Sequence, residues 1–322
     1  MTDPQPRMSN TYPIFDVRFL FKTMLYYRIY KILKPRTLKL SFEKWIHPPQ
    51  CPESDSCNKL KLAQPENSKA IIIGGTGSVG MATATQLLCS KACQVALIDT
   101  DITKGKDAVV SLNCNFGKDK AMFIKADVTN KMEIQDSLRK ARSELKQVDM
   151  IINTFGIWNE TKWEDEVNVN LVGTINVNNI AKEIVTRPGG TVINIIGLPG
   201  VETFPLSPVL AATYFGVLAY SQAKGHERSA NATGVRTVVL CCGITHSSLV
   251  KNIKVCCPQM ANDLKKYIKE ACWQKADAVG KATVELLKYA PSGGVWIVEG
   301  SRLFSLNWPD LGLCRKLENQ FI

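Results

Sequence analysis

The sequence lacks any apolar run of the ~20 residues that a membrane-spanning helix needs. It also lacks a secretory signal, because its N-terminus is polar and shows no short apolar core followed by small residues. Neither an internal repeat nor a low-complexity tract is present, which argues against repeat arrays and wholesale disorder. We therefore expect a globular protein in the cytoplasm, with a location at the periphery of a membrane as the alternative.

Cysteine usage fits neither a disulfide framework nor a zinc site. The chain has 11 cysteines, an odd number. Without a secretory signal, these are expected to be reduced thiols. Cys51 and Cys57 could form a metal site with His47, but their spacing matches no zinc pattern. We predict no metal.

Positive charge gathers at the N-terminal end. Residues 1–65 hold 11 Lys and Arg against 5 Asp and Glu, so they carry +6 of the net charge of +11. Aromatic and basic residues alternate in residues 1–46, which we treat as an N-terminal extension, and residues 47–68 are proline-rich and typical of a linker. Residues 12–46 could contact an anionic membrane surface or a protein partner. They contain no dense Lys/Arg run, so nucleic acid is not expected.

From residue 69 to residue 322 the pattern is that of one α/β domain. Apolar runs of strand length alternate with longer amphipathic segments, which is typical of a parallel sheet with helices on both faces. The fold class predicted is a doubly wound, parallel, seven-stranded sheet of Rossmann type plus the N-terminal extension. Strands are expected at 70–75, 93–99, 121–125, 148–154, 191–196, 236–242 and 294–298, and helices at 79–90, 104–112, 131–145, 166–185, 208–228 and 276–289.

A glycine-rich turn follows the first expected strand. Gly75, Gly77 and Gly80 form the spacing of a dinucleotide-binding turn, in which backbone N–H groups approach a pyrophosphate at a helix N-terminus. Asp99 ends the second strand, 19 residues beyond Gly80. A carboxylate there can accept the ribose hydroxyls and repels a 2′-phosphate, so NAD is favoured over NADP.

This layout resembles the short-chain dehydrogenase/reductase family, and within it the branch of insect alcohol dehydrogenases and 15-hydroxyprostaglandin dehydrogenase-like proteins. The resemblance covers roughly residues 69–311. The segment Ala126-Asp127-Val128-Thr129 resembles the family's adenine-contacting motif, and Asn153-Thr-Phe-Gly156 resembles its Asn-Asn-Ala-Gly motif, with Phe155 expected to narrow the groove. The candidate cofactor-binding residues are Gly74, Gly75, Thr76, Gly77, Ser78, Val79, Gly80, Asp99, Asp127, Val128, Asn153 and Gly156.

The family's catalytic residues are missing from the places where the resemblance puts them. A Ser should end the fifth strand, and a Tyr and a Lys four residues later should project from the next helix. Here these places hold Gly197, Leu210 and Tyr214, and of the catalytic set only Asn170 is kept. Leucine cannot exchange a proton, and a phenol cannot supply the ammonium that lowers the pKa of the base. The resemblance thus implies a dehydrogenase-like protein that keeps the fold and has impaired or no catalysis.

Two alternatives stay open. Tyr220 and Lys224 form a literal Tyr-x-x-x-Lys with Ser207 upstream, so the chain could be an active NAD-dependent oxidoreductase with a rearranged site based on them or on Tyr214. Alternatively, it could be a membrane-surface or scaffold protein that acts through the N-terminal extension. The resemblance further implies a homodimer formed through the helices expected at 166–185 and 208–228.

Overall fold

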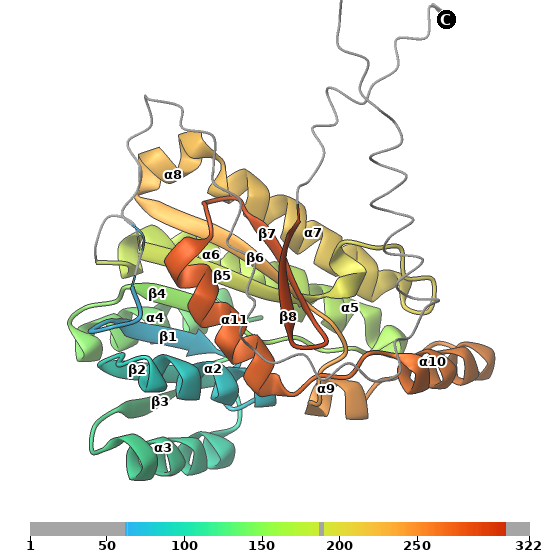
Figure 1. The fold of residues 1–322 in the computed structure, drawn as a ribbon, viewed down its shortest axis with the longest axis horizontal. Helices are drawn as coiled ribbons and strands as arrows, with labels where there is room; N and C mark the ends of the chain where they lie inside the picture. Colours follow the sequence, from blue (N-terminus) through green and yellow to red (C-terminus); the bar gives the residue numbers. More distant parts are fainter. Residues whose placement is uncertain (1–61, 63, 187–189, 307–322) are drawn as a thin grey trace, which may run out of the picture. The chain divides into compact units, whose positions relative to one another are not determined.

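The computed structural model describes residues 62, 64–186 and 190–306. It contains one eight-stranded sheet with the strand order β3-β2-β1-β4-β5-β6-β7-β8 (Figure 1). The strands are β1 (Lys69–Ile73), β2 (Gln94–Asp99), β3 (Ala121–Lys125), β4 (Met150–Asn153), β5 (Gly190–Gly197), β6 (Val235–Cys242), β7 (Val295–Glu299) and β8 (Arg302–Leu306). The extension at 1–46 and residues 47–61 and 63 of the linker, with His47, Cys51 and Cys57, lie outside the described residues.

The doubly wound parallel sheet predicted from the sequence is confirmed, with one correction. β1 to β7 pair in parallel, but β8 adds an eighth, antiparallel strand beside β7. Gly300 and Ser301 connect the two strands, and both have positive φ (55° and 64°). Two such residues make a tight hairpin whose twist matches the strands. The prediction missed β8 because its alternating pattern is weak and Ser is an uncommon residue at positive φ.

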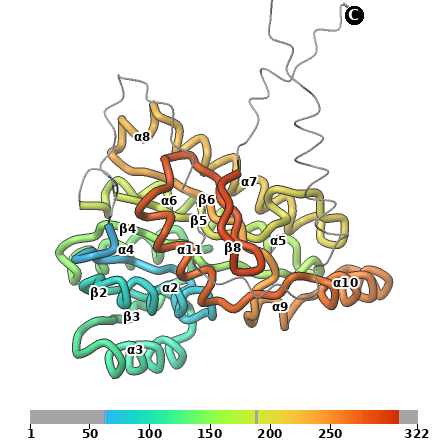
Figure 2. The backbone as a smooth tube through the Cα atoms, viewed as in Figure 1, coloured from blue at the N-terminus to red at the C-terminus, as the bar shows by residue number. Residues whose placement is uncertain are grey.

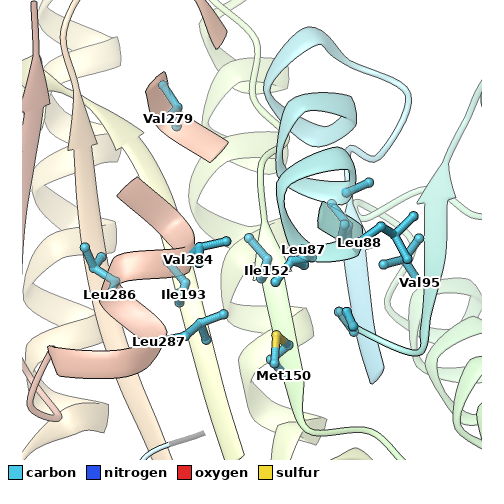
Figure 3. Packing of buried hydrophobic residues seen from close by; sticks show 14 of the residues in the cluster. Leu87, Leu88, Val95, Met150, Ile152, Ile193, Val279, Val284, Leu286 and Leu287 are labelled. Carbon is cyan, nitrogen blue, oxygen red and sulfur yellow. The ribbon is translucent and has the colours of Figure 1, made fainter. Parts of the chain in front are cut away.

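Helices cover both faces of the sheet. One face carries α2 (Ser78–Cys89), α3 (Ile102–Phe116) and α11 (Ala276–Tyr289), and the other carries α4 (Lys131–Leu145), α6 (Thr174–Ile184) and α7 (Pro208–Gly225). In Figure 3, Leu87 of α2 and Leu287 of α11 lie over Ile152 and Ile193 of the central strands. Because the parallel strands are buried on both faces, they read as continuous apolar runs in the sequence.

The helix expected at 166–185 is a longer and interrupted segment. It begins as α5 (Trp163–Val167), passes through the π-helical turn η2 (Asn168–Gly173) and continues as α6. A short 3-10 turn, η1 (Glu160–Lys162), precedes it. Single π-turns inside helices are often found at functional sites, and nothing in the apolar periodicity indicates them in advance.

The helix expected at 208–228 ends earlier than predicted. α7 stops at Gly225, which approaches Gly293 so closely that an added Cβ would lie 2.3 Å from its backbone nitrogen. The extended residue His226 follows, and its Nδ1 accepts the Arg228 backbone N–H to start α8 (Glu227–Thr233).

The segment between β6 and α11, for which the sequence predicts no helix, contains α9 (Ser248–Lys251) and α10 (Pro258–Glu270), which can be followed in the backbone tube of Figure 2. No helix of the described residues is long and apolar enough to cross a membrane.

Candidate functional site

A cavity of about 1120 Å³ lies at the C-terminal ends of the parallel strands. This is where an open α/β sheet usually binds its ligand. Its walls come from the segments that end or follow six strands: Gly74 after β1, Asp99 at the end of β2, Asp127 after β3, Thr154 after β4, Gly197 at the end of β5 and Gly243 after β6. The cavity therefore runs from the expected nucleotide turn to the expected catalytic frame.

The glycine turn is packed so closely that two of its positions accept only glycine. Gly74 has φ +76°, and an added Cβ would lie 2.6 Å from the Phe155 backbone nitrogen. At Gly80, an added Cβ would lie 2.3 Å from the carbonyl oxygen of Gly74. The absence of these side chains lets β1, the turn and α2 meet, so the pattern that predicted a dinucleotide site corresponds to a formed turn.

The N-terminus of α2 is open toward the cavity. Its N-cap is Gly77, which offers no side-chain hydrogen bond to the first helical turn, and Ser78 and Val79 line the cavity. The first N–H groups of a helix have no partner within the helix and attract anions. The residues present thus fit the pyrophosphate of a dinucleotide, which the open N–H groups of α2 would hold.

Asp99 is fixed at the end of the cavity by the glycine turn itself. Its Oδ2 accepts the backbone N–H of Thr76 at 3.0 Å and the hydroxyl of Thr76 at 2.6 Å, and its Oδ1 accepts the backbone N–H of Thr100 at 2.8 Å. A carboxylate has about four acceptor sites, so capacity remains for ribose hydroxyls.

Asp127 and Val128 occupy the neighbouring wall. One oxygen of Asp127, Oδ1, accepts both the backbone N–H and the hydroxyl of Thr129, at 2.8 and 2.7 Å. Val128 packs under Gly173, where an added Cβ would lie 2.8 Å from its Cγ2. Phe155 also lines the cavity, with its ring beside Gly173. The structure thus brings a carboxylate, an apolar side chain and an aromatic ring to the end of the cavity where the adenosine of a dinucleotide is expected.

Some of the candidate cofactor residues stand behind the wall. Asn153 is buried, and its Nδ2 donates to Oδ1 of Asn194 at 2.6 Å in a network that includes Asn178 and Ser221. The candidates on the cavity surface are Gly74, Thr76, Gly77, Ser78, Val79, Asp99, Asp127, Val128 and Gly156, whereas Gly75, Gly80 and Asn153 support it from behind.

At the catalytic end, Tyr214 fills the space beside Gly197. A Cβ added to Gly197 would lie 3.0 Å from Cε2 of Tyr214, and one added to Gly156 would lie 3.5 Å from the phenol oxygen. The side chain is 6% exposed and lines the cavity. Burial raises the pKa of Tyr214, and the nearby Glu166 and Cys242 raise it further. The phenol is therefore held in its neutral form.

Leu210 lies one helical turn before Tyr214, on the same side of α7. It is 1% exposed and belongs to an apolar cluster with Ile196, Leu198 and Phe204. It also lines the cavity. The structure thus places Gly197, Leu210 and Tyr214 together where the sequence expected the catalytic frame, and none of them combines an acid–base group of ordinary pKa with a neighbouring cation.

Asn170 lies in the π-helical turn, and its side chain hydrogen-bonds to the backbone of Ile157. Its Oδ1 accepts the backbone N–H of Ile157 at 2.9 Å, and its Nδ2 donates to the carbonyl oxygen of Ile157 at 2.9 Å. This pair joins η2 to the loop after β4. Asn170 therefore shapes the cavity next to Gly156 through that loop.

The structure does not bring Tyr220 and Lys224 to the cavity. The hydroxyl of Tyr220 donates to Oδ1 of Asn179 on α6 at 3.0 Å, and Lys224 Nζ lies 5.7 Å from the centroid of the Tyr220 ring. Burial raises the pKa of Tyr220 to about 12. Six residues separate Tyr214 from Tyr220, which on a helix of 3.6 residues per turn places them on different sides. Ser207 is also buried and does not line the cavity, and its hydroxyl oxygen accepts the Trp158 indole N–H at 2.6 Å.

Two buried carboxylates next to the catalytic frame were missed by sequence reasoning. Oε1 and Oε2 of Glu160 accept the backbone N–H groups of Leu210 and Val209 at 3.1 and 3.3 Å, at the start of α7. Glu166 is 0% exposed, and neither of its oxygens makes a hydrogen bond of normal geometry to a described residue. Burial, and then Glu160, raise the pKa of Glu166 to about 7, against an opposing contact with the Asn159 backbone N–H. Both acids fall in an acidic segment that reads as solvated helix surface, so no pattern singled them out.

The remaining wall is largely apolar and aromatic. Trp158 and Phe204 meet edge to face with ring centroids 5.9 Å apart, and Phe204 and Tyr267 do so at 5.1 Å. All three rings line the cavity, together with Leu249 of α9. This end is suited to an apolar group.

Comparison with known proteins gives one consistent result. The family model described as short chain dehydrogenase matches residues 68–255. Alcohol dehydrogenase 2 of Ceratitis cosyra is 31% identical over 186 residues, covering 56% of this chain and 71% of that protein. Human 15-hydroxyprostaglandin dehydrogenase [NAD(+)] is 26% identical over 187 residues, covering 57% and 70%.

Solved structures agree on the fold. A dehydrogenase/reductase from Sinorhizobium meliloti 1021 superposes with a TM-score of 0.62 at 16% identity, covering 73% of this chain and 95% of that one. Levodione reductase gives a TM-score of 0.61 at 18% identity, covering 73% and 97%.

Proposed function

Because the chain belongs to the short-chain dehydrogenase family, we propose that it binds NAD in the cavity and does not carry out the hydride transfer that NAD supports when bound. The observation that carries this proposal is the content of the catalytic frame. A leucine occupies the place of the general base, and a buried neutral phenol occupies the place of the ammonium. Loss of a general base typically costs ~10²–10⁴ in rate.

NAD binding is supported by the formed glycine turn, the open N-terminus of α2 and the fixed carboxylate of Asp99. Calorimetric titration should give a saturable signal with NAD and a weaker one with NADP, because a 2′-phosphate would meet Asp99. Replacing Asp99 by Ala should weaken NAD binding and relieve the repulsion of NADP. Tighter binding of NADP than NAD to the wild-type protein would overturn this preference.

The alternative function is an active NAD-dependent oxidoreductase whose catalytic base is Tyr214 or Tyr220. Tyr214 lines the cavity, but it has no cation beside it and its pKa is raised, so a phenolate is disfavoured. Assays with NAD and secondary alcohols should show no turnover in the wild-type protein or in the Tyr220→Phe and Tyr214→Phe variants. Turnover that is lost in one of these variants would identify the true base and refute the proposal.

A homodimer through α6 and α7 is proposed on the same family grounds. α7 has partly exposed apolar residues such as Phe215. Before α6, Trp163 of α5 is 52% exposed and Val172 of η2 is 37% exposed. Sedimentation at micromolar concentration should give a dimer. A monomer under these conditions would contradict the proposal.

A further inference from the structure

The cavity is poor in positive charge. Among the described residues that line it, the charged ones are Asp99, Asp101, Asp127, Asp165 and a single cation, Lys104, so four acids face one base and the sum is −3. Lys104 Nζ pairs with Asp101 at 2.9 Å. It also lies near Asp99, at the adenosine end.

Lys104 is too distant to act on the catalytic frame. β2 is separated from β5 by β1 and β4, which is three strand spacings, or ~14 Å at ~4.8 Å each. That exceeds the ~8 Å screening length at physiological ionic strength. The space around Gly197 and Tyr214 therefore receives no compensating charge from this lysine.

Glu166 places an acidic group next to α7 instead. It is fully buried on α5, which packs against α7, and it has no hydrogen bond of normal geometry among the described residues. It also raises the pKa of the Tyr214 phenol. The other titratable groups that act on the pair are Glu160 of η1 and Cys242 of β6, which are acids as well. Where the family carries an ammonium, this chain thus carries a phenol backed by a carboxyl group, and the sign of the local charge is reversed.

The two redox states of the nicotinamide cofactor differ in charge at the ring, which is positive when oxidised and neutral when reduced, whereas the adenosine and pyrophosphate parts are the same. We propose that the cavity distinguishes these states and binds the oxidised cofactor, NAD⁺, more tightly than NADH. The inference rests on the proposed binding of NAD. It would make the protein responsive to the oxidised cofactor without consuming it.

The size of the preference follows from the buried carboxyl group. One carboxylate within ~10 Å of a unit positive charge, at an effective dielectric constant of ~20, gives a preference of at least ~10-fold. Because the pKa of Glu166 is about 7, the group ionises as pH rises through neutrality, and a nearby cation favours the ionised form. NAD⁺ affinity should therefore rise between pH 6 and pH 8, while NADH affinity should stay level.

The test is calorimetric titration of the full chain with NAD⁺ and with NADH at both pH values. The expected result is tighter binding of NAD⁺, with the larger difference at pH 8. Glu166→Gln should remove the preference and its pH dependence while NADH still binds, which shows that the variant is folded. The matched control is Glu164→Gln, which neutralises an exposed carboxylate on the same helix and should keep the preference.

The outcomes separate the two proposals. Equal affinity for both redox states, or a preference for NADH, would overturn this inference and leave cofactor binding intact. A preference that survives Glu166→Gln would also overturn it, because the charge would come from elsewhere. If neither nucleotide binds, the proposed cofactor binding is wrong, and the inference falls with it.

Discussion

Gly197 and Tyr214 are predicted to be coupled in stability because the ring of Tyr214 occupies the space in which a side chain at position 197 would lie. A Cβ on Gly197 would lie 3.0 Å from Tyr214 Cε2 and 3.2 Å from Pro199 Cδ. The backbone of Gly197, with φ −90° and ψ 168°, is extended and suits any residue. The cost of Gly197→Ala is therefore steric, and overpacking of this degree costs about 1–2 kcal/mol.

A double-mutant cycle isolates this contact. Tyr214→Leu removes the Cε2 atom, so Gly197→Ala should cost at least ~1 kcal/mol less in that background, within the range found for residues in contact. The lower chain entropy of alanine in the unfolded state is the same in both backgrounds and cancels. The free energy of unfolding is measured by urea denaturation of the wild-type protein, both single variants and the double variant.

The control for the cycle is Gly216→Ala. Its added Cβ would meet the Leu171 side chain at 3.1 Å, away from the Tyr214 ring, so its cost should not depend on residue 214. If Gly197→Ala costs the same with Tyr214 and with Leu at that position, the Tyr214 ring does not occupy the space beside Gly197. The packing described for the catalytic frame would then be wrong.

Two further predictions concern the turn and the buried acid. Gly80→Ala should lower the free energy of unfolding by at least ~3 kcal/mol and abolish NAD binding, because its Cβ would lie 2.3 Å from a backbone oxygen. Gly77→Ala is the control, because its Cβ would have its nearest atom at 3.3 Å. It should change the free energy of unfolding, measured by urea denaturation, and NAD affinity, measured by titration, only slightly. The pKa of Glu166 is about 7 in the folded protein against an ordinary value of 4.5, so the folded state binds the proton more tightly than the unfolded state. The free energy of unfolding should therefore fall by at most about 3 kcal/mol as pH rises from 4.5 to 7. Glu166→Gln should flatten that part of the profile, and an unchanged profile would refute the assignment.

Much of the fold could be predicted from the sequence because parallel strands buried on both faces leave continuous apolar runs. All seven parallel strands were located in this way. The pattern gave no sign of β8, whose Arg302 and Ser305 are exposed and whose turn places a serine at positive φ. The prediction also missed α10, although Met260, Leu264, Tyr267 and Ile268 recur at helical spacing and Pro258 begins the helix.

Parts of the candidate site that require glycine for close backbone approach could be predicted from the sequence. Parts that arise from the packing of side chains distant in the sequence could not. Gly74 and Gly80 are required by close approach of backbone atoms, and such positions leave a motif in the sequence. The burial of Glu166 depends on α5, η2 and α7 meeting across more than forty positions of chain, which no local spacing encodes. The π-turn that carries Asn170 is equally invisible, since it shifts the helix register by hydrogen bonds and leaves the composition unchanged.

The central claim is that the protein holds NAD⁺ and leaves it unchanged. The most direct measurement is a calorimetric titration of NAD⁺ into the full chain in the presence of a secondary alcohol, followed by reading the NADH absorbance of the same sample. We expect a saturable binding signal and no NADH above a protein-free blank. Formation of NADH in proportion to the protein, or the absence of any binding signal, would contradict it.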